Sequence, residues 1–263
     1  MPHTPVKTAP NTAETTLTHL LQKAGHTNPA WTWGESVNVA CTPSPETEAR
    51  SATSMTDPDV ARTVIEEHAA SRGIPPNRHA ASLVFQRYCH RWCAITSWAW
   101  ALTGCVLDVS AERCATTFDN GSPVAIWIGH LQGAETDSTT LVDVVFEQHL
   151  MPIAYTFRDV ARFSIANARG NAAASLAAGF RFASTTLPAE KVLDLAESVF
   201  THPALQRSGT FRVINDSLNS RVFFDRNTCC HWDTVPDGQL CSWCSKRTHE
   251  DRTAQFTEAL AAQ

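Results

Sequence analysis

The sequence predicts a mainly helical α+β protein, in which a helical body carries a small antiparallel sheet and ends in a cysteine-rich segment. Three observations lead to this prediction. The 263 residues are 43% hydrophobic with only 11 glycines, which is enough apolar material for one sizeable core. Long stretches repeat apolar residues at helical spacing, whereas β-prone runs are short. Four of the nine cysteines fall within residues 229–244.

Charge and hydropathy exclude several classes of protein. The chain has 21 Lys and Arg against 26 Asp and Glu, a net charge of −5, so it lacks the broad basic surface that dominates nucleic-acid affinity. No window approaches the roughly 18 apolar residues that a membrane span requires. Residues 1–24 lack the apolar block of a secretory signal. We therefore expect a cytoplasmic protein that neither binds nucleic acid nor spans a membrane.

The first 57 residues show little periodicity. We expect the first dozen residues to form a loose arm, and residues 16–24 to form a short helix. Trp31 and Trp33 favour a strand or turn on the core, with an exposed aromatic binding site as the alternative.

Two helices are predicted next. Asp57 is a suitable N-cap, Pro58 suits the first helical position, and Gly73 ends the element. The second helix covers residues 78–103 and ends at Gly104. Its apolar residues recur at steps of three and four and form one seam: Phe85, Tyr88, Trp92, Ile95, Ala99 and Leu102.

The middle of the chain predicts the sheet. Residues 105–109, 114–118 and 124–128 are β-prone runs separated by turn residues, which is typical of antiparallel strands. Residues 140–145 predict a further β-prone start that runs into a helix ending near Pro152.

The rest of the body is predicted to be mainly helical. The Ala-rich residues 157–183 favour one or two closely packed helices, broken or bent near Gly170 and Asn171. A helix from Pro188 to Phe200 follows. Residues 211–214 and 221–225 are predicted to be strands. Thr248 and Asp251 form a capping box that begins a last helix, which has Phe256 and Leu260 on one face.

We interpret residues 1–225 as the body, and residues 226–263 as a cofactor-binding segment with a terminal helix that packs on the body. Cys229, Cys230, Cys241 and Cys244 in this segment form the pattern Cys-Cys-x10-Cys-x2-Cys. In a reducing compartment, clustered thiols are more often metal ligands than disulfides. A Cys-x2-Cys turn brings two sulfurs onto one metal.

The adjacent pair Cys229 and Cys230 favours one cofactor over another. Neighbouring side chains of a strand point to opposite faces, so both sulfurs reach one centre only if the backbone turns sharply there. Structural zinc normally takes two separated chelating pairs, whereas an iron–sulfur cluster offers metals at different positions. An iron–sulfur cluster is favoured, with zinc and a redox-active vicinal disulfide as alternatives. The other five cysteines are interpreted as small buried hydrophobes: Cys41, Cys89, Cys93, Cys105 and Cys114.

The cysteine spacing resembles the C-terminal signature of the FhuF-type ferric siderophore reductase family, whose members carry a 2Fe–2S cluster on Cys-Cys-x10-Cys-x2-Cys. Segments upstream also resemble this family, so that the likeness extends from about residue 80 to 245. The sequence departs from the family at residues 231–233 and at Ser242 and Trp243. The upstream segments are 81–88 with Arg91, 170–175, 202–205 and 223–226.

The resemblance implies an enzyme that reduces a ferric siderophore, of hydroxamate type, by one electron and releases Fe(II). The four cysteines would hold the cluster. The sequence shows no Gly-rich dinucleotide fingerprint, so electrons are expected from an external donor, either a ferredoxin or reduced flavin from a flavin reductase. Two alternatives stay open. One is a zinc-stabilised module that binds a siderophore or a protein, and the other is an iron–sulfur electron carrier or sensor.

Several residues near the cysteines are candidates for tuning the cluster or contacting its partners. Positive charge would favour the reduced form and raise the potential, and aromatic residues would cover the cluster or face the substrate. Arg87 and Arg91 lie one turn apart on the predicted helix 78–103, where they would bind siderophore carboxylates or pair with acidic neighbours. The cluster environment is Arg226, His231, Trp232 and Trp243, and the further contact candidates are Lys246 and Arg247.

Overall fold

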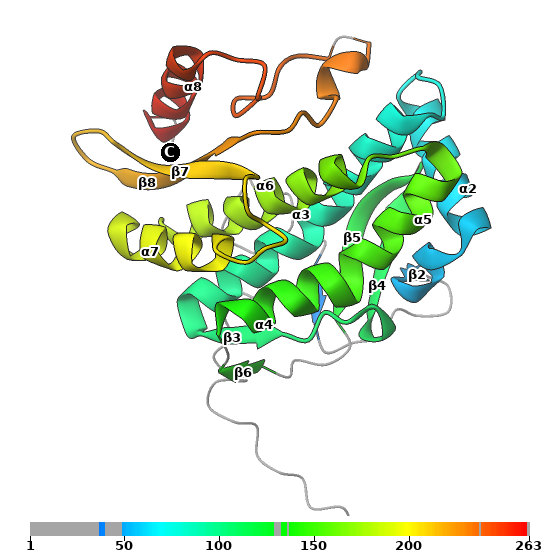
Figure 1. Ribbon diagram of the computed structural model, residues 1–263, viewed down its shortest axis with the longest axis horizontal. Coiled ribbons are helices and arrows are strands. Elements are labelled where there is room, and N and C mark those ends of the chain that lie inside the picture. Colours follow the sequence, from blue (N-terminus) through cyan, green and yellow to red (C-terminus); the bar gives the residue numbers. More distant parts are fainter. Residues whose placement is uncertain (1–36, 40–48, 129–132, 136, 237, 262–263) are drawn as a thin grey trace, which may run out of the picture.

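The computed structural model describes residues 37–39, 49–128, 133–135, 137–236 and 238–261. The expected N-terminal arm, the helix predicted at 16–24, Trp31, Trp33 and Cys41 lie outside the described residues. Within them, the mainly helical α+β class is confirmed, with helices forming the body and three small sheets accompanying them (Figure 1).

The first two long helices begin and end where the sequence predicts. In α2 (Pro58–Ser71), the Asp57 carboxylate accepts hydrogen bonds from the first turn. The helix α3 (Arg78–Thr103) ends at Gly104, whose φ of 72° is the left-handed conformation of a glycine C-cap. The apolar seam of α3 is buried as predicted, except that Leu102 is only half-buried.

The largest sheet has four strands in the order β1-β5-β4-β2. The predicted hairpin of β4 (Cys114–Asp119) and β5 (Ser122–Ile128) is confirmed. β2 (Ala49–Ser51) pairs antiparallel with β4, whereas β1 (Val37–Val39) pairs parallel with β5.

The strand β3 (Cys105–Leu107) does not join this sheet, although the sequence suggests that it would. It pairs instead with β6 (Gly133–Glu135). The chain turns after β3, where the Val109 N–H donates to the Leu107 carbonyl, and then enters the short helix η2 (Ala111–Arg113). These turns separate β3 from β4.

Residues 140–145 are helical, so the predicted β-prone start is wrong. They belong to α4 (Ser138–Val142) and to η3 (Asp143–Leu150), which has the wide turns of a π-helix. Their β-branched side chains favour strands, but Asp137 caps the helix by accepting from the Thr140 N–H, and the apolar face packs into the core.

Pro152 does not end a helix. It occupies the first turn of α5 (Met151–Ala161), where a missing N–H costs little. The wide turns of η3 precede it directly and change the hydrogen-bond register before the proline.

The Ala-rich stretch breaks earlier than predicted. Arg162 has φ 55° and Ser164 caps α6 (Ile165–Ala183), which then continues without a break through Gly170. A Cβ at Gly170 would collide with the side chain of Thr228. Gly170 therefore permits a close approach of the cysteine-bearing segment and does not bend the helix.

The C-terminal elements form a separate layer above the helices (Figure 1). The helix α7 (Ala189–Phe200) leads to a hairpin of β7 (Gly209–Asn215) and β8 (Ser220–Arg226). The helix α8 (His249–Ala261) begins with the predicted capping box and packs on the hairpin. The remaining helical turns are η1 (Thr53–Thr56) and η4 (Trp232–Thr234).

Apolar and ionic contacts attach α8 to the hairpin. Phe223 of β8 stacks on Phe256 of α8, with ring centroids 4.6 Å apart. Asp225, which is nearly buried, forms ion pairs with Arg212 and with Arg252, the latter at 3.2 Å. Among the described helices, none combines the length and apolar character that crossing a bilayer requires.

The buried His149 makes a pH-dependent contribution to stability. Its Nδ1 lies 2.6 Å from the Val109 carbonyl oxygen, which can only accept, so Nδ1 carries the proton. Nε2 therefore accepts from the Tyr88 hydroxyl at 2.7 Å. Burial lowers the pKa of His149 from 6.5 to about 4, although its hydrogen bond to Val109 opposes the shift.

We predict that the free energy of unfolding decreases as the pH falls from 6.5 to about 4. In this range the unfolded chain binds a proton on His149 and the folded chain does not, so acid favours unfolding by roughly 3 kcal/mol from this group. Urea unfolding across this range measures the effect. A His149→Gln variant is expected to show a flatter pH dependence, and an unchanged slope would contradict the prediction.

Candidate metal centre

The four cysteines lie on one irregular segment, residues 227–248, between β8 and α8. In Figure 1 this segment leaves the hairpin, runs out over the helical body to η4 and returns to α8. Both of its ends are fixed by regular elements. Its middle is held by contacts with α3 and α6.

A sharp turn follows the adjacent cysteines, close to where the sequence requires one. His231 adopts a left-handed conformation with φ 66°, and its N–H donates to Cys229 Sγ at 3.3 Å. Further along, a Cβ at Gly238 would collide with the Trp232 carbonyl. The loop between the two cysteine pairs therefore folds back toward the first pair.

The four thiols interact in a chain. The Cys241 S–H donates to the sulfur of Cys230, which lowers the pKa of Cys230 and raises that of Cys241. Burial raises the pKa of Cys229, which also interacts electrostatically with Cys230. Cys244 interacts electrostatically with Cys241, and its N–H donates to the Cys241 carbonyl at 3.0 Å. The structure thus brings the two cysteine pairs together.

All four cysteines are free thiols in the structure. Cys230 and Cys244 are buried, and Cys229 and Cys241 are half-buried. Within the part of the chain that the structure describes, no three Cys, His, Asp or Glu side chains already form a metal-binding arrangement.

Two side chains of the helical body hold the backbone of the cysteine pair. Asn167 Nδ2 of α6 donates to the Cys229 carbonyl at 2.6 Å. The Ser82 hydroxyl of α3 lies 3.1 Å from the Cys230 carbonyl oxygen. These bonds orient the peptide groups of the pair and fix the positions of its sulfurs relative to the body.

Arg226 is the most unusual residue of the site. Its side chain is fully buried, and one nitrogen donates to Asn171 Oδ1 at 2.7 Å and to Thr228 Oγ1 at 3.1 Å. The other two nitrogens, Nε and Nη1, have no hydrogen-bond partner. It forms no ion pair with a carboxylate of the described residues. Its guanidinium interacts electrostatically with the thiol groups of Cys230 and Cys241.

Arg226 provides the test of whether these residues suit a metal centre. The hydrogen bond between the two thiols has the largest effect on their pKa values, lowering that of Cys230 and raising that of Cys241, and the positive charge of Arg226 is a smaller influence that favours both thiolates. A buried charge without a counterion is costly. Four thiolates around zinc, or around two ferric ions and two sulfides, would carry a net negative charge beside it. The donor set and its charge environment therefore fit both candidate cofactors.

The basic residues after the cysteines are partly engaged. Lys246 pairs with Asp233, and this hydrogen bond lowers the pKa of Asp233. The Arg247 guanidinium donates to the Leu240 and Cys241 carbonyls at 2.9 and 3.0 Å. Arg247 therefore holds the backbone of the second cysteine pair, which is a different role from the substrate contact considered for it.

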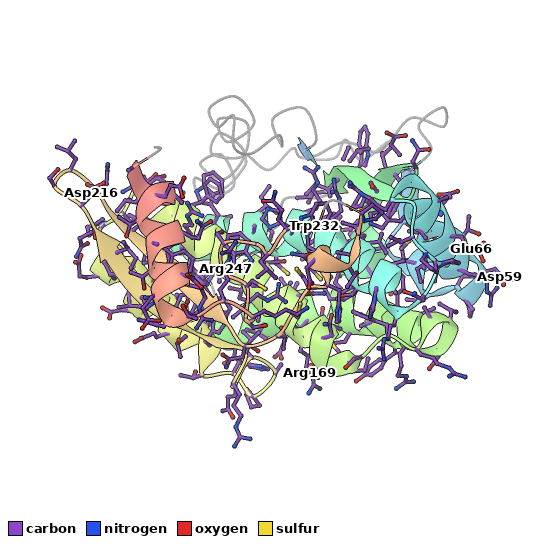
Figure 2. All side chains as sticks on the ribbon, turned by 90° about the horizontal axis from the view of Figure 1, so that it is seen from above. Asp59, Glu66, Arg169, Asp216, Trp232 and Arg247 are labelled. Atoms are coloured by element: carbon purple, nitrogen blue, oxygen red, sulfur yellow. The ribbon has the colours of Figure 1, made fainter. Side chains whose placement is uncertain are left out.

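The aromatic residues lie on different sides of the centre. His231 stacks on His79, with ring centroids 4.6 Å apart. Trp232 lies under the guanidinium of Arg72, 5.4 Å from its ring centroid. Trp243 packs beside the apolar cluster of Phe223 and α8. Figure 2 shows Trp232 toward α2 and Arg247 toward α8.

Arg87 and Arg91 are both half-buried on α3, where Arg87 lies close to Arg91 and to Arg72 of α2. Neither is among the charges that shift the pKa values of Cys229, Cys230 and Cys241. Arg87 is thus related to the cysteine segment through Arg72, whose guanidinium lies over Trp232. Four further cysteines are buried as predicted: Cys89, Cys93, Cys105 and Cys114.

Sequence reasoning missed the residues that support the centre from a distance. Asn167, Thr228 and Arg72 carried no recognisable motif. Ser82 and Asn171 fell in segments that resemble the FhuF-type family, but their contacts were not foreseen. One signal was available, because a glycine inside an Ala-rich helix often marks a close approach of another segment.

Comparisons with known proteins define the fold and leave the family open. No protein family and no curated protein matches the sequence. The chain is similar to the structure of ATP-bound aerobactin synthetase IucA from a hypervirulent pathotype of Klebsiella pneumoniae, with a TM-score of 0.51 and 11% identity over 79% of this chain. A second structure of aerobactin synthetase IucA from that pathotype has a TM-score of 0.49 and 10% identity over 81% of this chain.

The chain spans about half the length of these solved structures, 46% and 49% respectively. At such low identity the likeness concerns the fold alone.

Proposed function

We propose that the protein is a cytoplasmic iron–sulfur reductase that transfers one electron to the ferric ion of a siderophore. The observation that carries this proposal is the hydrogen bond from Cys241 to Cys230, which joins the two pairs of free thiols close to the buried, incompletely partnered guanidinium of Arg226. The resemblance of the cysteine spacing to the FhuF-type family supports the choice of cofactor and substrate.

The roles of the residues follow from their contacts. Cys229, Cys230, Cys241 and Cys244 would hold a 2Fe–2S cluster, which supplies and accepts one electron at a time. Arg226 would stabilise negative charge at the centre from within the body. Backbone N–H groups, such as that of His231 toward Cys229, would stabilise the thiolates. Asn167 and Ser82 hold the geometry.

The reaction we propose is a release step. The ferric ion of a hydroxamate siderophore gains one electron and becomes Fe(II), whose lower charge weakens its hold on the oxygen ligands. The electron comes from an external ferredoxin or reduced flavin, because no part of the sequence carries a dinucleotide-binding fingerprint.

Replacing Cys230 with serine tests this proposal. We expect the wild-type protein, purified without oxygen, to be brown, with visible bands that bleach on reduction, and to release one Fe(II) per reduced centre from a ferric trihydroxamate. We expect Cys230→Ser to lose the bands and this activity, because a serine oxygen is a poor substitute for a thiolate in an iron–sulfur centre. Absorption, paramagnetic resonance and a ferrous chelator measure these outcomes.

The matched control is Cys105→Ser, which makes the same chemical change at a buried thiol of β3 outside the cysteine segment. It should keep the spectrum. A colourless wild-type protein that binds zinc would identify the zinc-stabilised module instead. A brown protein that ferric siderophores reoxidise no faster than buffer does would identify an electron carrier or sensor.

A further inference from the structure

The side chain of Asn171, on α6, holds the guanidinium of Arg226 from within the helical body. Asn171 is fully buried, and its Oδ1 accepts a hydrogen bond from Arg226 Nη2 at 2.7 Å. Its Nδ2 donates to Asn167 Oδ1 at 3.1 Å and to the carbonyl and hydroxyl oxygens of Ser82 at 3.2 Å. Because a guanidinium can only donate, the amide oxygen must face Arg226, and this fixes the orientation of the amide.

The same network reaches the backbone of the first cysteine pair. Asn167 Nδ2 donates to the Cys229 carbonyl at 2.6 Å, and the Ser82 hydroxyl lies 3.1 Å from the Cys230 carbonyl oxygen. Asn171 contacts both Asn167 and Ser82. It therefore connects the buried charge of Arg226 to the two side chains that hold the peptide groups of the cysteines.

The hydrogen-bond partners of Arg226 are electrically neutral. They are the amide oxygen of Asn171 and the hydroxyl of Thr228, and no carboxylate of the described residues forms an ion pair with Arg226. The preceding residue of β8, Asp225, pairs instead with Arg212 and Arg252. Successive side chains of a strand point to opposite faces, so this carboxylate is directed away from Arg226.

A neutral partner leaves the positive charge of Arg226 available to the thiols. Buried arginines are normally paired with a counterion, and an aspartate has nearly the same shape as the asparagine found here. A carboxylate at this position would cancel much of the field of the guanidinium. With Asn171, that field favours the thiolates of Cys230 and Cys241, and it opposes the effect of burial on Cys89 of α3.

We propose that Asn171 is a positioning residue that holds Arg226 beside the cysteine centre without neutralising its charge. The inference rests on the proposed function and deepens it, because it names the residue that lets a full positive charge act on an anionic centre. That charge favours the reduced form of the centre and strengthens binding of any metal held by thiolates.

Two substitutions of Asn171 separate this role from a merely structural one. Asn171→Leu removes every hydrogen bond of the amide and adds no charge, whereas Asn171→Asp keeps an oxygen toward Arg226 and adds a negative charge. If Asn171 only supported the fold, leucine would be the more damaging change. We expect aspartate to be the more damaging change for the properties of the centre.

The first measurement is the reduction equilibrium of the loaded centre, by potentiometric titration with paramagnetic resonance. We expect Asn171→Asp to shift it toward the oxidised form at least roughly tenfold, which is about 59 mV for one electron, and further than Asn171→Leu does. The second measurement is Co(II) binding to the cofactor-free protein, followed by the thiolate-to-cobalt absorption bands. We expect affinity to fall roughly tenfold in Asn171→Asp and less in Asn171→Leu.

The matched control is Ala166→Asp, which adds the same charge to an exposed position of α6. Solvent screens this charge, so both properties should stay within about twofold of the wild type. Urea unfolding of the cofactor-free proteins shows which variants fold.

A second pair of variants tests the same charge effect if the Asn171 variants do not fold. Thr228 Oγ1 accepts from Arg226 Nη2 at 3.1 Å, so Thr228→Asp also places a carboxylate against the guanidinium. Its control is Thr228→Asn, which has nearly the same shape and no charge. We expect the lower potential and the weaker Co(II) binding in Thr228→Asp.

The inference is overturned if leucine is more damaging than aspartate in both measurements, or if Ala166→Asp has as large an effect as Asn171→Asp. Either result beside an active iron–sulfur reductase leaves the proposed function standing. Conversely, if Co(II) affinities follow the expected order but the protein assembles no iron–sulfur centre, the reductase function fails and the role of Asn171 stands.

Discussion

Replacing Arg226 with methionine is expected to lower the reduction potential of the loaded centre by on the order of 100 mV, the effect of removing one nearby positive charge at the effective dielectric of a protein. Reduction adds negative charge beside Arg226, so losing the guanidinium disfavours the reduced form. Potentiometric titration followed by paramagnetic resonance measures the shift. Equal potentials in the two proteins would contradict the role that we assign to Arg226.

In the protein without its cofactor, the same substitution should leave the free energy of unfolding unchanged or increase it. There Arg226 is a buried charge with two unpartnered nitrogens, and replacing such a group with an apolar side chain is often neutral or stabilising. Urea unfolding of the cofactor-free Arg226→Met variant checks this and shows that the variant folds. The control Arg226→Lys keeps the charge and should retain most of the potential.

Replacing Gly170 with alanine is expected to displace the cysteine segment and to cost about 1–3 kcal/mol of stability, the usual penalty of overpacking. The added Cβ meets Thr228, which lies next to Cys229, and the overlap includes the Thr228 Cβ. Rotating the threonine therefore does not relieve it. Elsewhere in a helix, alanine normally stabilises relative to glycine, so the expected sign is reversed. Chemical unfolding and cofactor content per chain measure the two effects.

A double substitution distinguishes this collision from a general effect of the helix. Thr228→Gly removes the side chain that the alanine would meet, so Gly170→Ala with Thr228→Gly should be less damaging than the sum of the two single changes. Strict additivity would show that Gly170 acts through α6 alone. Far-ultraviolet circular dichroism should report an intact helical body in all three variants.

Local signals explain why many element boundaries were predictable from the sequence. The Asp57 cap, the Gly104 stop and the Thr248 and Asp251 capping box each lie within a few residues of the end they define. The apolar seam of α3 follows from its own periodicity. Such signals need no knowledge of the tertiary structure, and all of them are confirmed.

The wrong predictions depend on contacts that a local reading does not contain. The β-branched residues 140–145 favour a strand by propensity, but the Asp137 cap and burial of their apolar face make them helical. Gly170 was expected to mark a bend, because the reason for a glycine there is Thr228, which lies far along the chain. Strand β3 was assigned to the wrong sheet because its partner β6 was not recognised.

The candidate site also combines features that are local in sequence with contacts that depend on the tertiary structure. Four cysteines within one short window were recognisable from their spacing, and the structure brings their two pairs together. The support for that window comes from α3 and α6, through Ser82, Asn167 and Asn171. The contact between Arg72 and Trp232 likewise joins segments that are distant in sequence. Only the fold relates them.

The cysteine segment is pinned at both ends, by β8 on one side and by α8 with its own small apolar cluster on the other. This arrangement confines the cysteine pairs to a loop whose two ends are held by apolar and ion-pair contacts. If the proposed cofactor is bound there, its four ligands would cross-link a loop that is anchored at both ends. Removing the cofactor is then expected to loosen that loop and to leave the contacts between β8 and α8 in place.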